Sequence, residues 1–234
     1  MDDFIINPGS GDGVHSHPRI SGEISSVKLT PLDTQALVEG AKVEHTTVHG
    51  ALCAAVISVA RSLKAEWNDK KLQLMSPVCA RKKLNAGEEF FLCITTKPVF
   101  FDPNSEEDFW SLAREAKQGL NGVENLSHVV EFNEILQHVA FNQQQVPPVL
   151  EVLKQAFSHE LMVSNLGQLK FSTQIGNFKI TDLWGPMILS GRGDAQTIGA
   201  ITCNGSLHLT AISENPLIGL LGKVGDLLRE ASQG

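Results

Sequence analysis

The chain has 234 residues, of which 42% are hydrophobic and 19% charged, and it carries a formal net charge of −7. The negative balance argues against a nucleic-acid-binding surface, which needs clustered Lys and Arg. No stretch approaches the roughly 20 apolar residues of a membrane span, and the start Met1-Asp2-Asp3 lacks the basic and apolar segments of a signal peptide. We therefore expect a soluble, cytoplasmic protein with neither nucleic acid nor a membrane as its partner.

The first 22 residues are rich in Gly, Ser, Pro, Asp and His and have little periodicity, which predicts a flexible arm over residues 1–22. Neither an internal repeat nor a low-complexity linker follows. We therefore expect one domain over residues 23–234. The four cysteines lie far apart without CxxC spacing, so the sequence predicts buried free thiols and no metal site.

Helix signals dominate the first half of the domain. Thr30 with Pro31 starts a short helix that ends near Gly40, and Thr46 caps a longer one that continues to Leu63. Ser105 with Asp108 starts a third helix, and further helices are expected over residues 127–141 and 147–157. Strands are predicted over residues 71–78 and 89–96.

The second half of the domain is predicted to form consecutive strands, followed by a final amphipathic helix that begins at Pro216. Gly176-Asn177 and Asn204-Gly205 are residue pairs typical of tight hairpin turns. The predicted strands cover residues 161–164, 168–175, 178–183, 187–190, 197–203 and 206–212. Helices at both ends of a largely antiparallel set of strands favour the α/β class, as a two-layer sandwich with a mostly antiparallel mixed sheet covered by helices.

Four histidines are candidates for a general base or a metal ligand. His15 and His17 lie in the predicted arm, which holds neither of them in place. His45 and His49 are four residues apart, but the helix is expected to start between them and no third ligand is near, so structural roles are favoured over metal binding.

The segment Ser164-Asn165-Leu166-Gly167 is predicted to form a turn between two strands. Ser and Asn in a turn commonly hydrogen-bond their own backbone, which is the structural interpretation of this pair. The alternative is that both polar groups face a substrate.

Three segments in order resemble a known superfamily. Residues 46–55 (TTVHGALCAA) resemble the T-V-x-x-x-L-x-A-A helix of condensation-type acyltransferases of the chloramphenicol acetyltransferase-like superfamily. Residues 76–81 (SPVCAR) are similar to a strand that ends in Arg, residues 163–167 (VSNLG) match a strand-end element, and residues 108–113 resemble an F-W-x-L-A helix. The resemblance covers about residues 24–231.

The resemblance implies a fold of two similar halves that meet at a tunnel, of which this chain is the C-terminal half. An acyl thioester of coenzyme A or of a carrier-protein phosphopantetheine enters from one side, and an alcohol or amine from the other. The family's general base lies in an HHxxxDG motif of the first half, which this sequence lacks. The resemblance therefore implies that this chain holds no catalytic residue and is inactive without the missing half.

By the same resemblance, Ser164 and Asn165 line the tunnel and offer hydrogen bonds to an acyl carbonyl or oxyanion, and Gly167 allows close backbone approach. Asp182 and Gly185 lie near a structural Asp-Phe-Gly-Trp-Gly element of plant members, which implies a structural role for both. Two other hypotheses stay open. One is a non-catalytic module that binds an acyl group, pantetheine or another small ligand, and the other is a subunit that forms a homodimer or docks on another chain.

Overall fold

The computed structural model describes residues 23–87, 93–103, 108–142, 158–191 and 193–233. The predicted arm and the predicted helix over residues 147–157 lie outside them, as do His15, His17 and Ser105.

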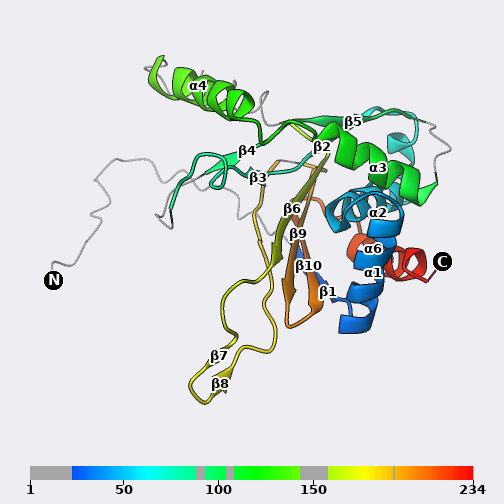
Figure 1. Cartoon of the computed structure of the whole chain (residues 1–234). Coiled ribbons are helices and arrows are strands. Elements are labelled where there is room, and N and C mark those ends of the chain that lie inside the picture. The colour runs from blue at the N-terminus through cyan, green and yellow to red at the C-terminus, as the bar shows by residue number, and fades with distance from the viewer. Residues whose placement is uncertain (1–22, 88–92, 104–107, 143–157, 192, 234) are drawn as a thin grey trace, which may run out of the picture.

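A six-stranded mixed sheet forms the centre of the described fold (Figure 1). Its order is β1-β10-β9-β6-β2-β5. The β9–β6 and β6–β2 pairs are parallel, and the other three pairs are antiparallel. The mostly antiparallel mixed sheet is therefore confirmed. The strands are β1 (Glu23–Lys28), β2 (Leu72–Met75), β5 (Val99–Phe101), β6 (Leu161–Gln168), β9 (Gln196–Cys203) and β10 (Ser206–Ser213).

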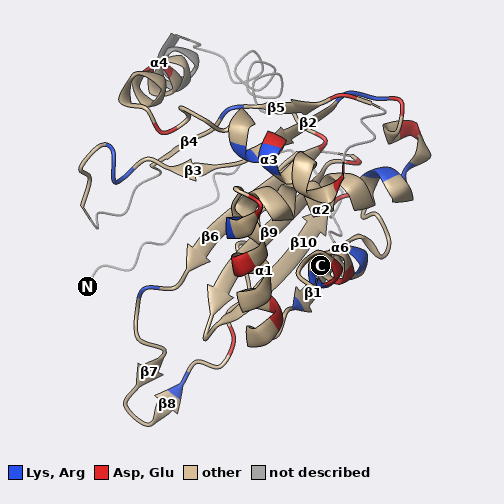
Figure 2. Ribbon diagram, turned by 45° about the vertical axis from the view of Figure 1, so that its right-hand side comes forward, with Lys and Arg blue, Asp and Glu red and all other residues tan. Residues whose placement is uncertain are grey.

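Helices cover one face of this sheet, as Figure 1 shows for α1, α2 and α6, with α3 packed on α2. Ten of the sixteen residues of α2 are buried, and small side chains along this helix let its neighbours approach closely. The three central strands β6, β9 and β10 carry no Lys, Arg, Asp or Glu (Figure 2). The layer consists of α1 (Pro31–Val43), α2 (Val48–Leu63), the short 3₁₀ helix η1 (Ala65–Trp67), α3 (Phe109–Gly119) and α6 (Leu220–Ala231).

The helix starts follow local capping chemistry. Thr30 caps α1, as the sequence predicts, and Asp33 completes a reciprocal capping box with it. Thr47, not Thr46, caps α2 by accepting from the Gly50 amide, because the Thr46 hydroxyl donates instead to the carbonyl of Ala113. Asp108 caps α3.

Two smaller units extend from the sheet. One consists of helix α4 (Leu126–Asn142) beside the short pair β3 (Val78–Cys79) and β4 (Ile94–Thr95). The other is a hairpin of β7 (Gln174–Ile175) and β8 (Phe178–Lys179), which projects away from the sheet in Figure 1. Cys79 is exposed on β3, so the prediction of four buried thiols is wrong for this one.

Residues 181–190 cross the face of the sheet opposite the helices, and we call this segment the strap. The predicted strands over residues 178–183 and 187–190 are wrong apart from β8. The edges of β9 and β10 are already taken by neighbouring strands, so the strap lies on the sheet face instead. Its contacts come from side chains: Thr210 Oγ1 donates to the carbonyl of Pro186 at 3.2 Å, and the hydroxyls of Ser190 and Thr197 are 2.9 Å apart.

Within the described residues, no single helix is long and apolar enough to cross a membrane. Helices α1 and α2 together satisfy the criteria of length and composition, but they are bent by 99°. Ten residues of α2 are buried in the core of the protein.

Candidate functional site

The segment predicted as a turn is a bulge inside one continuous strand. β6 runs through Ser164 to Gln168, and its register against β9 shifts between Asn165 and Gln168. Gly167 adopts a φ of 70°, and its amide donates to Asn165 Oδ1 at 2.8 Å. An extra residue of this kind bends a strand and re-aims its side chains. The side-chain oxygen of Asn165 therefore stabilises the bulge in which Asn165 itself lies.

Ser164 and Asn165 lie on opposite faces of the sheet, because neighbouring side chains alternate along a strand. Asn165 shares a register row with Ala200 on the helix-covered face. Ser164 shares a row with Gly199 and Thr210 on the strap-covered face. The structure thus separates the two predicted hydrogen-bond donors.

The Ser164 side chain is 7% exposed, and its hydroxyl makes no hydrogen bond within the described part of the chain. It differs from the Thr95 hydroxyl, which is fully buried and also lacks a partner. A serine hydroxyl that has no partner among the described residues is available to bind a ligand oxygen.

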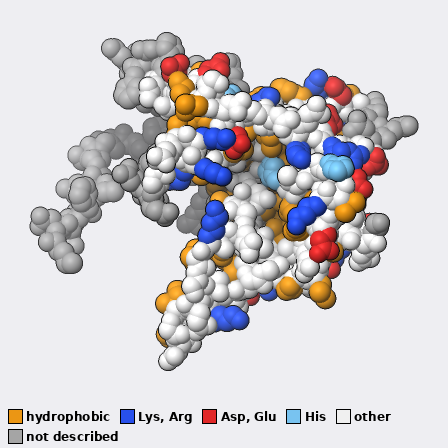
Figure 3. All heavy atoms as spheres, viewed as in Figure 1, with side chains coloured by type: hydrophobic (Ala, Val, Ile, Leu, Met, Phe, Trp, Pro, Cys, Tyr) orange, Lys and Arg blue, Asp and Glu red, His pale blue; other side chains and the backbone are white. Residues whose placement is uncertain are grey.

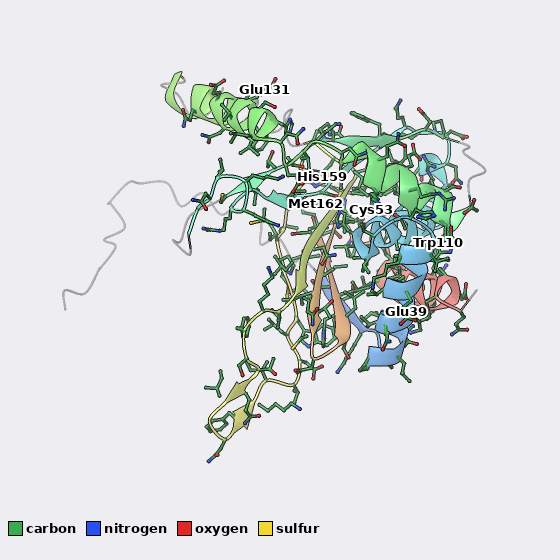
Figure 4. All side chains as sticks on the ribbon, in the orientation of Figure 1. Glu39, Cys53, Trp110, Glu131, His159 and Met162 are labelled. Atoms are coloured by element: carbon green, nitrogen blue, oxygen red, sulfur yellow. The ribbon has the colours of Figure 1, made fainter. Side chains whose placement is uncertain are left out.

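The strap lies directly beside this row. A β-carbon at residue 199 would be only 1.9 Å from the carbonyl oxygen of Pro186. Glycine at this position therefore lets the strap rest on β9. Further along, the Ser190 hydroxyl contacts Met162 Sδ at 3.1 Å and His159 Nε2 at 3.4 Å, and Figure 4 shows His159 and Met162 near the start of β6.

The predicted structural residues Asp182 and Gly185 both lie in the strap. Asp182 Oδ1 accepts hydrogen bonds from Lys28 and from His208 Nε2, the latter at 2.8 Å. The Lys28 ammonium, followed by His208, holds the pKa of the Asp182 carboxyl well below its ordinary value. Gly185 has a φ of 146°, in a region that favours glycine, and precedes the cis peptide to Pro186.

A second polar cluster lies on the helix-covered side, at the start of α2 and the end of β2. His49 Nε2 is 2.9 Å from Ser76 Oγ and 3.5 Å from Cys53 Sγ. Figure 4 shows Cys53 on the side of α2 that faces β6. The sequence favours a structural role for His49 over metal binding beside His45, without indicating its partners. Its contact with Ser76 has no signal in the sequence, because 27 residues separate the two.

Burial makes this cluster electrically neutral. It lowers the pKa of His49 to about 4 and raises the pKa of the Cys53 thiol to about 12. A histidine with so low a pKa is a weak base near neutrality, and a protonated thiol is a poor nucleophile. The cluster therefore joins α2 to β2 and does not resemble an activated nucleophile. No group of three or more His, Cys, Asp or Glu in the described ranges could hold a metal ion.

A mostly antiparallel mixed sheet covered by helices is the arrangement that the sequence predicts for half of an acyltransferase-like fold. Comparisons with known proteins support this class. A family described as Phthiocerol/phthiodiolone dimycocerosyl transferase C-terminus matches residues 21–87. Together with the structural matches below, this match shows that the chain has the fold of the C-terminal half of the CoA-acyltransferase-like architecture.

Three solved structures illustrate the likeness. A wax ester synthase/diacylglycerol acyltransferase from Marinobacter aquaeolei VT8 is 11% identical, with a TM-score of 0.58 over 91% of this chain and 49% of its own. A trichothecene 15-O-acetyltransferase from Fusarium sporotrichioides is 10% identical, with a TM-score of 0.60 over 90% and 47%. The first condensation domain of the CDA synthetase is 16% identical, with a TM-score of 0.56 over 90% and 44%.

The chain thus spans about half the length of the solved structures it matches. A comparison with curated protein sequences gave no match.

Proposed function

We propose that this chain is the C-terminal half of a thioester-dependent acyltransferase that transfers an acyl group to an alcohol or amine. The Ser164 hydroxyl is the observation that carries the proposal, because it lies on the strap-covered face and makes no hydrogen bond to any residue that the structure describes. In this role it donates a hydrogen bond to the acyl carbonyl oxygen and to the oxyanion that develops during attack. The regular pairing of Ser164 with Gly199, before the bulge begins, places its side chain on this face.

The proposed donor is an acyl thioester of coenzyme A or of a phosphopantetheine arm, both of which are anionic. Lys and Arg side chains gather around the hollow in the middle of the face seen in Figure 3, which suits such a donor. We place the reaction in the cytoplasm, a reducing compartment that suits the four free cysteines.

Transfer to a hydroxyl needs a base that takes its proton as attack proceeds. The neutral His49 cluster is unsuited to this role, so the proposal assigns the base to an N-terminal half. Large apolar side chains that remain exposed on the hairpin, the bulge and the strap support docking of such a half. They are Leu166, Phe171, Ile175, Phe178, Met187 and Ile188.

Titration calorimetry with acetyl coenzyme A and with a longer acyl-pantetheine tests the proposal. We expect Ser164→Ala to weaken binding about fivefold, the value of one ordinary hydrogen bond. Ser172→Ala is the matched control, because the only partner of the Ser172 hydroxyl among the described residues is Gln174 in its own turn. Equal affinity in the wild type and both variants would contradict the assignment of Ser164.

A thiol-release assay with a panel of alcohols tests the need for the other half. We expect the chain alone to release no more thiol than the uncatalysed reaction. Turnover by the chain alone that Ser164→Ala abolishes would refute this requirement, and it would place the base within this chain or a second copy of it.

A further inference from the structure

Asn204 and Gly205 form the turn between β9 and β10. Both residues have a positive φ, 49° for Asn204 and 80° for Gly205, as a tight hairpin turn of this kind requires. Glycine at position 204 would also adopt this conformation, because it has no β-carbon to clash. The turn therefore needs the backbone conformation of residue 204 but not its side-chain amide.

The side-chain amide of Asn204 bonds instead to both arms of the β7–β8 hairpin, at its base. Nδ2 donates to the carbonyl of Ile180 at 2.8 Å and to that of Thr181 at 3.0 Å. Oδ1 accepts from Thr173 Oγ1 at 2.9 Å. The two arms also bond to each other here, because the Ile180 amide donates to the Thr173 carbonyl at 2.8 Å. Both N–H groups and the oxygen of the Asn204 amide are thus used to bridge this last rung of the hairpin.

Residues 170–180 have few other ties to the body of the protein. Among the residues that the structure describes, their remaining hydrogen bonds stay within the segment. The next bonds to the sheet lie outside the segment, at Leu169 before the hairpin and at Asp182 after it. Packing adds little, since Phe171 is 56% and Phe178 82% exposed. Figure 1 shows the hairpin continuing beyond the end of the sheet at which the β9–β10 turn lies.

We infer that Asn204 is a positioning residue whose side-chain amide fixes the direction of the hairpin, and of the start of the strap, relative to the sheet. We call its three hydrogen bonds the clasp. The clasp holds residues 173, 180 and 181 against the end of β9 and β10. Without it, the segment between Leu169 and Asp182 is anchored only at its two ends, so the hairpin can swing about them.

A fixed direction matters because the hairpin carries exposed apolar side chains, those of Phe171, Ile175 and Phe178. A segment that is already held in one orientation loses less conformational entropy on binding a partner than a mobile segment does. The use of this surface to dock an N-terminal half rests on the proposed function. The clasp itself is a property of the free chain, whatever its activity.

NMR of the ¹⁵N-labelled intact chain tests the clasp without any ligand. In the wild type, the backbone amides of residues 174–179 should have order parameters of about 0.8, close to those of a rigid backbone, and residual dipolar couplings that fit the alignment of β9 and β10. Asn204→Gly keeps the turn and removes the amide. The order parameters should then fall below about 0.6 and the couplings should be averaged. The Cys203 and Ser206 amides should stay ordered, which shows that the turn persists.

Variants of Thr173 test the clasp from the hairpin side, with the turn untouched. Thr173→Val removes one of the three bonds and should speed hydrogen exchange of the Ile180 amide about twofold, whereas Asn204→Gly removes all three and should speed it about tenfold. Thr173→Ser keeps the hydroxyl and should exchange like the wild type. A mobile hairpin in the wild type, or wild-type order parameters and couplings in Asn204→Gly, would overturn the inference. Neither measurement involves an acyl donor or a second half, so failure of the proposed function would not change these results.

Discussion

The carbonyl oxygen of Pro186 rests on the α-carbon of Gly199, at the place that a side chain would otherwise fill. A β-carbon added there would lie 1.9 Å from that oxygen and 2.7 Å from Thr210 Oγ1. Strap and sheet therefore touch through backbone, and this contact lies in the same register row as Ser164.

Replacing Gly199 by alanine should displace the strap. We expect Gly199→Ala to lower the free energy of unfolding by about 1–3 kcal/mol, the usual cost of overpacking, and to raise hydrogen exchange over residues 184–188. Urea denaturation and exchange mass spectrometry measure the two effects.

Gly222→Ala provides the contrast. Its added β-carbon meets nothing within 4 Å on helix α6, so the variant should gain about 0.5–1 kcal/mol from helix propensity alone. Equal effects of the two substitutions would show that the strap does not rest on Gly199.

The pKa of His49 predicts a specific loss of stability in acid. The folded protein resists protonation of His49 down to about pH 4, whereas an unperturbed histidine is protonated below 6.5. The unfolded chain thus binds the extra proton in this window, and the free energy of unfolding falls as the pH drops from 6.5 to about 4. Full loss of this contribution amounts to about 3 kcal/mol.

Urea denaturation across this pH window should show the difference between wild type and His49→Gln shrinking as the solution becomes more acid. His45→Gln is the matched control, because His45 is exposed before the helix. Its difference from wild type should stay constant. A constant difference for His49→Gln as well would contradict the burial of a neutral imidazole.

The reactivity of the cysteine thiols should decrease with their burial. At about pH 8 we expect a chromogenic disulfide to modify the exposed Cys79 rapidly. Cys53, whose pKa burial raises to about 12, should react only when the chain unfolds. Peptide mapping after brief labelling identifies the modified residue, and rapid modification of Cys53 in the folded protein would show that the core around His49 opens.

Several elements could be predicted because their causes are local. The start of α1 at Thr30, the helix around residues 127–141 and the Asn204-Gly205 turn all depend on residues a few positions apart. The resemblance to the superfamily also predicted the overall fold, which is half of the acyltransferase-like architecture.

The predictions failed where partners distant in sequence decide the structure. The strap resembles two strands in its hydrophobic pattern, but β9 and β10 have no free edge to pair with it. Ser164 and Asn165 are predicted to share a turn, but both lie within β6, where neighbouring side chains alternate between the two faces of the sheet. The contacts of His49 with Ser76 and of His208 with Asp182 join segments that the sequence gives no reason to connect.

The projecting hairpin should contribute little to the stability of the isolated chain. Phe178 is 82% exposed, so Phe178→Ser should change the free energy of unfolding by less than about 0.5 kcal/mol. Phe101 is 0% exposed, and Phe101→Ala should cost about 3–5 kcal/mol. Denaturant titration compares the two, and a large loss in Phe178→Ser would show that the hairpin belongs to the folded core.

The most direct test is to locate the surface to which an acyl donor binds. Backbone amide NMR of the chain, titrated with a non-hydrolysable acyl-pantetheine, should shift the resonances of residues 163–167 and of the adjacent strap. Ser164→Ala should weaken these shifts. Saturable shifts confined to other surfaces, or no shift at millimolar ligand, would contradict the assignment of this face as the site of an acyltransferase half.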